Sequence, residues 1–476
     1  MSSTPTHSTE ETASSTSASA GITTEMLQRL DVPGPRYTSY PTADRFVDGF
    51  GAADLGAALK RRATAAASPP LSLYVHIPFC ESVCYYCACN KVVTRDHGRA
   101  AAYLVALEQE MALYAQALGV RRSISQLHFG GGTPTFLSDD ELRRLMSSLR
   151  RAFDIAPGAE MSIEVDPRTV TQQRLQLLAG LGFNRLSLGV QDFDERVQRA
   201  VHRLQPHDAV RELVIAAREI GFESINMDLI YGLPLQTPAS FARTIGQVSA
   251  LRPDRIALYA YAHLPQRFKP QRRIHTSELP PAGDRVEMLG MAISGFLEHG
   301  YDYIGMDHFA LPTDALAVAK RQGRLHRNFQ GYSTQPDCDL IGLGVSAIGE
   351  MGGCYSQNAK TLPEYYEALA AGRLPAVRGL NPDADDRLRR QIIMSLMCQG
   401  SVDLDAIERQ HRIDARLYFF DELVRLQALA EKGLVELNEG VVTVTRTGWF
   451  FVRAVAMVFD RHLHAARDSE RFSRIV

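Results

Sequence analysis

The sequence predicts an α/β protein whose main domain is a partial TIM-like (β/α)6 barrel, followed by a mainly helical C-terminal domain. Two observations predict this fold. From residue 71, six apolar, β-favouring runs alternate with amphipathic stretches that have helical spacing. Near residue 381 the alternation stops, and helical patterns followed by one hairpin replace it. Right-handed crossovers would close the first series into a partial barrel, although a doubly wound sheet also fits the pattern.

Composition excludes several classes of protein. A chain of 476 residues with 45% hydrophobic content is long enough for a large core and more than one domain. A net charge of −2 offers no global field that would attract nucleic acid or an anionic membrane. No apolar run reaches the ~18 residues needed to span a bilayer. Seven cysteines gathered largely in one place do not form a secreted disulfide framework. We therefore expect a cytoplasmic protein without a membrane span.

Two segments precede the first predicted strand. Residues 1–30 are expected to form a disordered tail, because their start is rich in Ser, Thr and Ala and lacks the features of a secretory or transit signal. Residues 31–70 are expected to form an N-terminal arm, because prolines and glycine exclude regular structure at its beginning. Arg36, Tyr37 and Tyr40 are unusual for a linker, so we expect the arm to be ordered over a site and its residues to clamp or cover a substrate.

The six runs lie within residues 71–380, the predicted catalytic domain. They are Leu71–His76, Ile124–Phe129, Met161–Val165, Arg185–Val190, Ile225–Ile230 and Arg255–Tyr261. Between them, apolar residues such as Leu104, Leu107 and Met111 recur at helical spacing, which indicates helices that bury one face. In such a fold the chemistry gathers at the carboxyl ends of the strands.

Four of the seven cysteines fall within ten residues, on a loop just past the first predicted strand. Cys80, Cys84 and Cys87 have the spacing C-x3-C-x2-C, and Cys89 follows. Thiolates this close favour one soft metal centre, and the second ligand pair that zinc sites usually have is missing. Three ligands on one loop suit three irons of a [4Fe–4S] cluster and leave the fourth iron open. The pattern favours such a cluster over zinc, a redox dithiol or a chance grouping. It is typical of the radical S-adenosylmethionine (SAM) enzymes, which the chain resembles.

Polar residues and glycines lie at the predicted strand ends. Gly130-Gly131-Gly132-Thr133 would let a backbone approach a ligand closely. Glu164 offers a carboxylate for ribose hydroxyls. The next strand ends with Gln191, and Arg203 follows; the fifth carries Asp228. Each position alone is more often structural, but equivalent placement at successive strand ends favours a shared site.

Residues 381–476 are predicted to form the C-terminal domain. Helices are expected at Arg387–Cys398, Leu404–Gln410, Ala415–Leu429 and about Thr447–His462, with a hairpin before the last. Helices followed by a hairpin resemble a winged helix. Its recognition helix lacks a dense face of Lys and Arg, so we expect a lid or docking domain rather than a DNA-binding one.

Long strings of residues identify a closer resemblance. From about Val32 to the C-terminus, the chain resembles the oxygen-independent coproporphyrinogen III oxidases of haem biosynthesis. The strings are Gly34–Thr42, Tyr74–Cys80, the Cys-x-Cys-Asn motif ending at Asn90, Gly130–Pro134, Gly189–Phe193, Gly305–Phe309 and Asn328–Tyr332.

The resemblance implies a reaction and its cofactors. These enzymes oxidatively decarboxylate two propionates of coproporphyrinogen III to vinyl groups, giving protoporphyrinogen IX, by means of a 5′-deoxyadenosyl radical. They bind a [4Fe–4S] cluster and two molecules of SAM. The resemblance also implies an electron donor such as flavodoxin or ferredoxin, a monomer, and no nucleic-acid partner.

The resemblance also implies site residues by motif. Cys80, Cys84 and Cys87 would hold the cluster, and Cys89 would be needed for activity without being a ligand. The first SAM would meet Tyr74, Gly131, Glu164 and Ile348. The second would meet Tyr86, Gly132, Thr133, Gln191, Arg203, Asp228 and Ala262, with Gln330 facing it. Tyr86 and Ala88 replace the Phe and Gly that the family commonly has.

An alternative within the superfamily is a haem chaperone or a haem-processing enzyme. Chaperone relatives generally lack the extension at Cys87–Asn90 and the N-terminal arm, and both are present here. An iron–sulfur DNA-binding regulator is a further alternative, but it would give the barrel strands no role.

Overall fold

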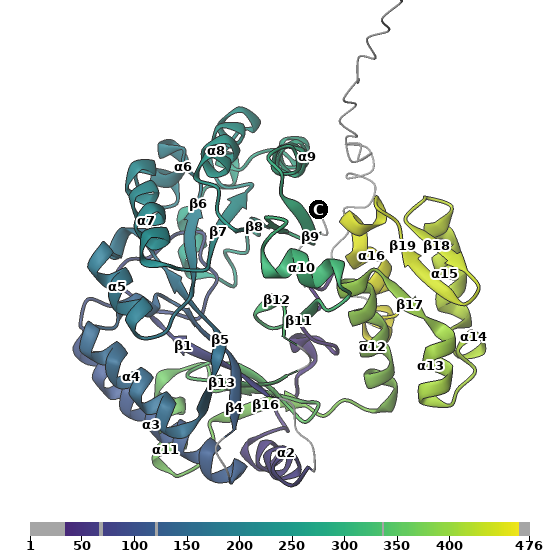
Figure 1. Cartoon of the computed structure of the whole chain (residues 1–476), viewed down its shortest axis with the longest axis horizontal. Coiled ribbons are helices and arrows are strands. Elements are labelled where there is room, and N and C mark those ends of the chain that lie inside the picture. The colour runs from purple at the N-terminus through teal and green to yellow at the C-terminus, as the bar shows by residue number, and fades with distance from the viewer. Residues whose placement is uncertain (1–33, 66–69, 120–121, 336–337, 466–476) are drawn as a thin grey trace, which may run out of the picture.

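The computed structural model describes residues 34–65, 70–119, 122–335 and 338–465 (Figure 1). The tail expected at residues 1–30 lies outside the described residues. No helix in the described part of the chain is long and apolar enough to cross a membrane.

The six predicted strands are all present and form the centre of one curved sheet. They are β1 (Leu71–Ile77), β4 (Ser123–Gly131), β5 (Asp154–Val165), β6 (Arg185–Gln191), β7 (Ser224–Tyr231) and β8 (Arg255–Ala260). Neighbours in this order are parallel, so the strand order follows the chain and never reverses. The partial barrel is therefore confirmed, and the doubly wound sheet, which reverses its strand order, is excluded.

Helices cover the outer face of the strands, as Figure 1 shows. The crossover helices are α3 (Gly98–Leu118), α4 (Asp139–Ala152), α5 (Gln172–Gly180), α6 (Glu195–Ala200), α7 (His207–Ile220), α8 (Pro238–Leu251) and α9 (Ala282–Glu298). Their ends carry recognisable signals: Ser138 and Glu141 form a capping box at the start of α4, and Gly221 ends α7 in a left-handed conformation. In α3, the predicted stripe that includes Leu104, Leu107 and Met111 is buried.

The sheet continues at both edges. Beside β1 lie β13 (Asp339–Leu343), which is parallel to it, and then the antiparallel strands β14 (Ile348–Met351), β15 (Cys354–Asn358) and β16 (Ala376–Leu380). Beside β8 lie β10 (His308–Ala310) and β9 (Asp302–Gly305), and α10 (Ala315–Arg321) follows. Within the described ranges the two edges do not pair, so the barrel stays open between β9 and β16. Figure 1 shows the C-terminal domain on that side.

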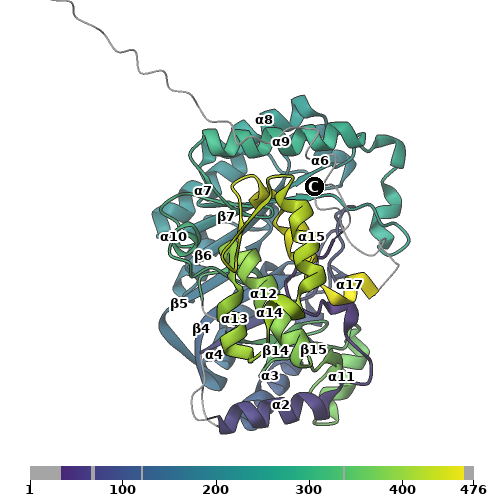
Figure 2. The same ribbon diagram turned by 90° about the vertical axis from the view of Figure 1, so that its right-hand side faces the viewer.

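The C-terminal domain has the predicted winged-helix-like composition. It contains α12 (Ala384–Gln399), β17 (Ser401–Asp403), α13 (Leu404–His411), α14 (Ala415–Tyr418), α15 (Phe420–Ala430), β18 (Val435–Asn438) and β19 (Val441–Val444) (Figure 2). β19 is the central strand of its sheet, between β17 and β18.

Two helices predicted as continuous are interrupted. The predicted helix at Ala415–Leu429 breaks at Phe419, whose ring is fully buried and lies 5.5 Å from that of Phe459. The predicted helix at Thr447–His462 becomes η6 (Gly448–Phe451), α16 (Val452–Met457) and α17 (Arg461–Ala465). The break between α16 and α17 follows from Asp460, whose carboxylate caps α17 by accepting from the backbone N–H groups of its first turn.

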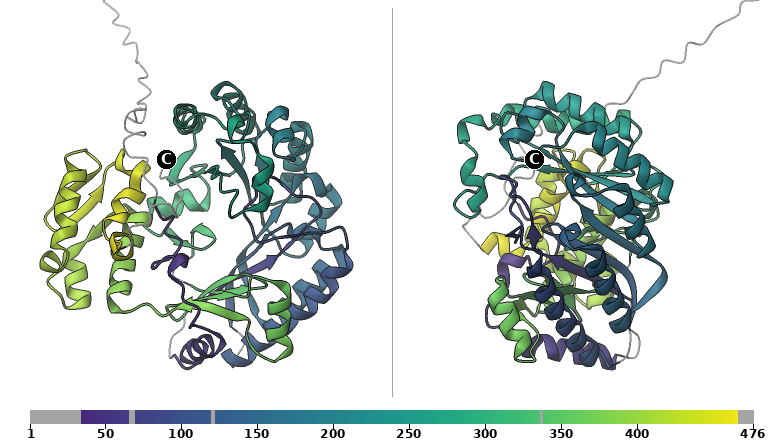
Figure 3. Two further views of the ribbon diagram at one scale, coloured as in Figure 1. Left: turned by 180° about the vertical axis from the view of Figure 1, so that it is seen from behind. Right: turned by 90° about the vertical axis from the view of Figure 1, so that its left-hand side faces the viewer.

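The N-terminal arm runs between the barrel and the C-terminal domain, as the view from behind shows (Figure 3). Tyr37 and Tyr40 are fully buried. The Tyr37 hydroxyl donates to Asp460 at 3.0 Å, and the Tyr40 hydroxyl accepts from the backbone N–H of Arg461 at 3.1 Å. The suggestion that these two tyrosines clamp a substrate is therefore wrong: they fasten the arm to the C-terminal domain. The arm then leads into α2 (Ala52–Thr64).

Candidate active site

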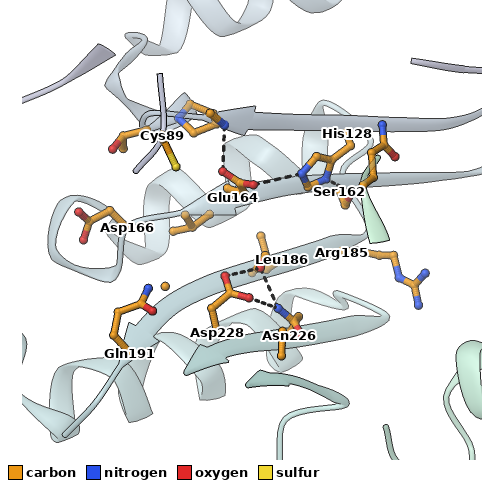
Figure 4. A pocket seen from close by; sticks show the side chains of 18 of the residues that line it. Cys89, His128, Ser162, Glu164, Asp166, Arg185, Leu186, Gln191, Asn226 and Asp228 are labelled. Atoms are coloured by element: carbon orange, nitrogen blue, oxygen red, sulfur yellow. Dashed lines mark hydrogen bonds and ion pairs between the residues drawn. The ribbon is translucent and has the colours of Figure 1, made fainter. Parts of the chain in front are cut away.

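A polar cavity of about 390 Å³ lies inside the barrel and extends to the carboxyl ends of the strands (Figure 4). Its lining alternates along the strands, because every second side chain points inward. On β5 these positions are Glu160, Ser162 and Glu164, and on β7 they include Asn226 and Asp228. The strands that read as apolar runs therefore carry their polar residues on one face, toward the cavity.

The cysteine loop forms the mouth of this cavity. It begins with β2 (Phe79–Cys80), which pairs with β3 (Val92–Val93) just beyond the loop. Cys80, Cys84, Cys87 and Cys89 all line the cavity, and none is in a disulfide. Among the described residues, no group of three His, Cys, Asp or Glu side chains is arranged to hold a single metal ion.

Donor groups surround the thiols. The Thr133 hydroxyl donates to the Cys80 sulfur at 3.5 Å, and the guanidinium of Arg203 donates to the Cys84 sulfur at 3.5 Å. Arg168 approaches the same sulfur at 3.7 Å. Hydrogen bonds and positive charge at the sulfurs stabilise the anionic thiolate form, which is the form that binds iron.

The pKa values of these thiols differ with their surroundings. Burial raises the pKa of Cys80 to about 11. The hydrogen bond from Cys89 lowers the pKa of Cys87 below that of an ordinary thiol, and Lys91 adds to this shift. The same hydrogen bond raises the pKa of Cys89. The loop thus favours a thiolate at Cys87 and a protonated thiol at Cys89.

The glycine triplet is required by neighbouring protein atoms. A Cβ at Gly131 would lie 2.6 Å from the His76 ring, and the φ of Gly131 is +116°. A Cβ at Gly132 would lie 2.7 Å from the backbone of Pro78. The backbone N–H groups of Gly132 and Thr133 donate to carbonyls of Ile77 and Phe79. The three glycines therefore allow the end of β4 to pack closely against the start of the cysteine loop.

Glu164 is held ionised beside the glycine triplet. It accepts from the backbone N–H of Gly131 at 3.0 Å and from Nε2 of His128 at 3.4 Å. Burial alone would raise the pKa of Glu164, but these hydrogen bonds and the neighbouring charge of His128 lower it. The His128 ring stacks on that of Tyr74, with centroids 5.8 Å apart.

A second polar group lies across the cavity. Arg203 donates to the carbonyl of Gly189 through Nε at 3.1 Å and to Asp166 through Nη1 at 3.2 Å. Gln191 follows on the same strand with a φ of +69°. The next residue, Asp192, is buried and accepts from Gln236 and Thr244, which holds the turn in this conformation.

Asp228 completes the group. It accepts from the Ser187 hydroxyl at 3.1 Å and from the Asn226 amide at 2.8 Å (Figure 4). Burial, and then the charge of Glu164, raises the pKa of Asp228 to about 6. Its carboxyl group thus holds a proton more readily than an ordinary Asp does, and it faces a polar cavity.

The structure brings together most of the residues that the sequence predicts for the site. The predicted residues that line the cavity are Cys80, Cys84, Tyr86, Cys87, Cys89, Gly131, Gly132, Thr133, Glu164, Gln191, Arg203, Asp228 and Gln330. Tyr74, Ala262 and Ile348 are not in its lining. Tyr74 adjoins it through His128, the carbonyl of Ala262 accepts from Gln271, and the backbone of Ile348 packs against Gly342.

Sequence reasoning missed two histidines on the inner face. His128 bonds Glu164, as described above. His76 accepts from the Tyr74 hydroxyl at 3.1 Å and donates to the carbonyl of Asn90 at 2.9 Å, at the end of the cysteine loop. Their signal in the sequence is a polar residue at every second position of an apparently apolar strand: Tyr74 and His76 on β1, and Gln126 and His128 on β4.

Two arginines lie close to tyrosines of the cavity lining: Arg36 of the arm, and Arg327 of β11 (His326–Asn328), which pairs with β12 (Gly331–Ser333) in a separate two-stranded sheet. Arg36 forms an ion pair with Asp307 and lies over the ring of Tyr259, 5.2 Å from its centroid. Arg327 donates to the carbonyl of Arg36 and lies 4.6 Å from the ring centroid of Tyr332. The Nη1 atom of Arg327 is buried without a hydrogen-bond partner among the described residues. Tyr259 and Tyr332 both line the cavity.

Comparison with known proteins agrees with this geometry. A family model described as the radical SAM superfamily matches residues 74–248, and one described as the HemN C-terminal domain matches residues 383–451. The chain is 49% identical over 454 residues to the oxygen-independent coproporphyrinogen III oxidase of Pseudomonas aeruginosa, covering 95% of this chain and 98% of the relative. It is 47% identical over 451 residues to that of Escherichia coli K12, with the same coverage of both chains.

A solved structure extends the similarity to the fold. The structure of coproporphyrinogen III oxidase (HemN) from Escherichia coli, a radical SAM enzyme, matches with a TM-score of 0.86 and 48% identity. The match covers 90% of this chain and 97% of that one.

Proposed function

Because this chain belongs to the oxygen-independent coproporphyrinogen III oxidases of the radical SAM superfamily, we propose that its barrel cavity is where two propionates of coproporphyrinogen III become vinyl groups. In each conversion a propionate side chain gives one hydrogen atom to the 5′-deoxyadenosyl radical, releases one CO₂ and passes one further electron to an electron acceptor. The observation that carries the proposal is the cysteine loop at the mouth of a polar cavity, opposite an arginine-bearing arm.

The residues of the loop fit a [4Fe–4S] cluster. Cys80, Cys84 and Cys87 supply thiols of the required spacing, and Thr133 and Arg203 direct donors at two of them. Neutral or positive donors suit an anionic iron–sulfur centre better than carboxylates would. The raised pKa of Cys80 is compatible with this role, because a bound metal deprotonates a thiol outright.

When bound, the cluster and SAM supply the radical that takes a hydrogen atom from a propionate side chain. The protein's own residues position that chemistry. Glu164, fixed by Gly131 and His128, would accept from the ribose or amine of the first SAM. Tyr74 and the backbone of Ile348 would lie behind it. Cys89, held protonated beside Cys87, is available to the reaction without being a ligand.

The opposite wall would hold the second SAM. Gln191, Arg203 and Asp228 offer an amide, a guanidinium and a carboxyl group toward the cavity, and the carboxyl oxygens of Asp228 would accept from ribose hydroxyls. Tyr86, Gly132, Thr133, Ala262 and Gln330 would complete this site. Of these residues, Ala262 is the one outside the cavity lining.

Arg36 of the arm and Arg327 would recognise the carboxylates of the substrate. Arg36 lies between Asp307 and the aromatic face of Tyr259, and Arg327 keeps one buried N–H atom without a partner among the described residues. Guanidinium groups bind carboxylates in a planar, bidentate geometry. Arg36 and Arg327 would thus orient propionates that extend past Tyr332 and Tyr259.

Other features of the enzyme are proposed with the function. The segments are a tail (1–30), an arm (31–70), a catalytic domain (71–380) and a C-terminal lid or docking domain (381–476). The enzyme would act as a cytoplasmic monomer that takes electrons from a carrier such as flavodoxin or ferredoxin and binds no nucleic acid.

The direct test is an anaerobic assay with coproporphyrinogen III, SAM and dithionite, in which the porphyrin products are oxidised and identified by fluorescence. The expected result is protoporphyrin in place of coproporphyrin, with CO₂ released in proportion. Stable uptake of haem without SAM, and no vinyl product, would instead support a haem chaperone.

A further inference from the structure

We propose that the basic segment 264–276, between β8 and α9, forms a docking surface for a small acidic one-electron carrier protein beside the cysteine loop. The proposal rests on the function proposed above, because reduction of a cluster requires such a donor. It names a surface of the protein outside the cavity, since none of the cations of this segment lines that cavity.

The segment carries a strong positive charge, although the chain as a whole is slightly negative. Between Leu264 and Thr276 the sequence has four cations, Arg267, Lys269, Arg272 and Arg273, and no Asp or Glu, whereas the net charge of the chain is −2. All four cations are exposed. Among the described residues none of them forms an ion pair: Arg272 donates to the carbonyl of Pro265, and Arg273 lies over an aromatic ring. Their charge is therefore directed to solvent.

The segment is fastened directly to the cysteine loop. The amide of Gln271 donates to the carbonyl of Tyr86 at 2.9 Å, between Cys84 and Cys87. The guanidinium of Arg273 lies 5.1 Å from the ring centroid of Tyr85. Ile274 is buried in a small apolar cluster that both tyrosines join. The segment that carries the cations is thus packed directly against the loop that would hold the cluster, and Arg273 contacts that loop.

Val201 and His202, just after α6, also hold the same loop in place. The Tyr85 ring stacks on that of His202 at 5.1 Å, and the backbone N–H of Tyr85 donates to the carbonyl of Val201. His202 in turn donates to the carbonyl of Val83. The loop is thus held by two segments of the chain, while residues 85–87 remain only partly buried. A partner that covers this edge would approach the cluster without entering the substrate cavity.

The chemistry of the partner follows from these features. An exposed positive surface increases the association rate with a negative partner and loses that advantage as salt increases. The electron that enters the cluster leaves a reduced flavin or iron–sulfur centre, which is oxidised by one electron in the same step. A small acidic flavodoxin or ferredoxin has both the charge and the redox centre that this surface requires.

The test reverses three charges that touch neither the cavity nor the loop: Arg267→Glu, Lys269→Glu and Arg272→Glu together. Arg273 and Gln271 stay unchanged, because they contact the cysteine loop. The control carries the same change of net charge on the C-terminal domain, through Arg409→Glu, Arg416→Glu and Lys432→Glu, all exposed positions. Both variants are compared with the unchanged enzyme.

Two measurements separate docking from chemistry. The first is the Kd of oxidised flavodoxin, and in parallel of a [2Fe–2S] ferredoxin, for cluster-free protein between about 0.02 and 0.2 M salt. The second is vinyl formation driven by the reduced carrier and, separately, by dithionite. We expect the triple variant in segment 264–276 to bind the carrier with a Kd that is higher by about tenfold or more, and to form vinyl groups with the reduced carrier about tenfold more slowly. Its Kd for the carrier should also lose most of its dependence on salt. Its dithionite-driven rate should be unchanged, and the control should match the unchanged enzyme throughout.

Several outcomes would overturn the proposal. Equal Kd values for all three proteins would show that the carrier docks elsewhere. A dithionite-driven rate that falls with an increased KM for coproporphyrinogen III would show that the segment steers the tetracarboxylate substrate instead. If the unchanged enzyme forms no vinyl product with dithionite, the proposed function fails, while the Kd comparison still tests the docking surface.

Discussion

Gly131 and His76 lie on neighbouring strands so close together that a Cβ on the glycine would stand 2.6 Å from the imidazole ring. The backbone of Gly131 has a φ of +116°, which side chains rarely permit. This contact joins the end of β4 to the residue that hydrogen-bonds the far end of the cysteine loop at Asn90. The conformation of the loop that would hold the cluster therefore depends on a glycine at position 131.

Gly131→Ala should disrupt the site more than the fold. The added methyl must displace His76, at a cost of about 1–3 kcal/mol in unfolding free energy, and should lower iron incorporation and SAM binding strongly. Unfolding in denaturant, iron content and the Kd of SAM measure these effects. Gly158→Ala is the control, because Gly158 also has a positive φ (+76°) but no neighbouring atom within 4 Å. Equal loss of iron in both variants would contradict the account.

Glu164→Gln should weaken SAM binding while the cluster remains. The amide keeps the shape of the side chain but loses the charge that His128 and the N–H of Gly131 stabilise. A lost charge-assisted hydrogen bond is worth about 1.5–3 kcal/mol, so the Kd of SAM should rise roughly 10- to 100-fold. Calorimetric titration with SAM and iron analysis check both parts. An unchanged Kd would remove Glu164 from the first SAM site.

Arg36→Ala should raise the KM for coproporphyrinogen III about tenfold, because one carboxylate partner is lost. The Kd of SAM should remain unchanged. Arg45→Ala is a matched control on the same arm, since Arg45 donates to the carbonyl of His462, whereas Arg36 lies over Tyr259 of the cavity lining. Steady-state kinetics with varied substrate distinguish the two variants. Equal KM values would show that Arg36 has no role in recognising substrate.

Glu110 predicts a pH dependence of stability. Its carboxylate is fully buried and accepts from Gly344, Asn358 and Tyr365, and burial raises its pKa to about 7 from an ordinary 4.5. The folded protein therefore keeps a proton that the unfolded chain releases. The stability from this group is complete below pH 4.5 and declines as the pH rises toward about 7.

Glu110→Gln should flatten that decline. The variant should be less stable at pH 5, because an amide nitrogen would face a donor, yet it should lose less stability than the unchanged protein between pH 5 and pH 8. Urea unfolding at several pH values measures this. Glu108→Gln, on the same helix, should leave the decline between pH 5 and pH 8 as it is, because hydrogen bonding from Arg144 lowers the pKa of Glu108 and its contribution to stability is lost only as the pH falls below about 4.5. A parallel pH dependence of Glu110→Gln and the unchanged protein would contradict the assignment.

Local patterns predicted the fold, and most of the residues that they proposed for the site line one cavity. The three cysteines proposed as cluster ligands lie on one short loop, so their spacing could be read directly from the sequence. The order of strands followed from alternation and right-handed crossovers. Three glycines at the end of β4 were predicted to approach a ligand, but the close atoms belong to His76, Pro78 and Glu164. A glycine in the sequence can indicate that no room is left for a side chain, but it does not identify the neighbouring atoms that occupy that room.

Long-range contacts could not be read from the sequence. Arg36 and Asp307 are separated by 271 positions, and their ion pair depends on how the arm crosses the barrel. Tyr37 looked like a substrate clamp, but its hydroxyl donates to Asp460, 423 positions away. Asp460 also breaks a helix that the apolar spacing predicted as continuous. These outcomes depend on tertiary packing, which local propensity does not encode.

The most direct measurement is the iron content and visible absorption of the anaerobically reconstituted protein and its single cysteine variants. The unchanged protein and Cys338→Ser should bind about four irons per chain with a brown chromophore. Cys80→Ser, Cys84→Ser and Cys87→Ser should each lose the cluster, whereas Cys89→Ser should keep it and lose vinyl formation. Zinc or no metal in the unchanged protein, or a Cys84→Ser variant that retains both the cluster spectrum and vinyl formation, would contradict the account.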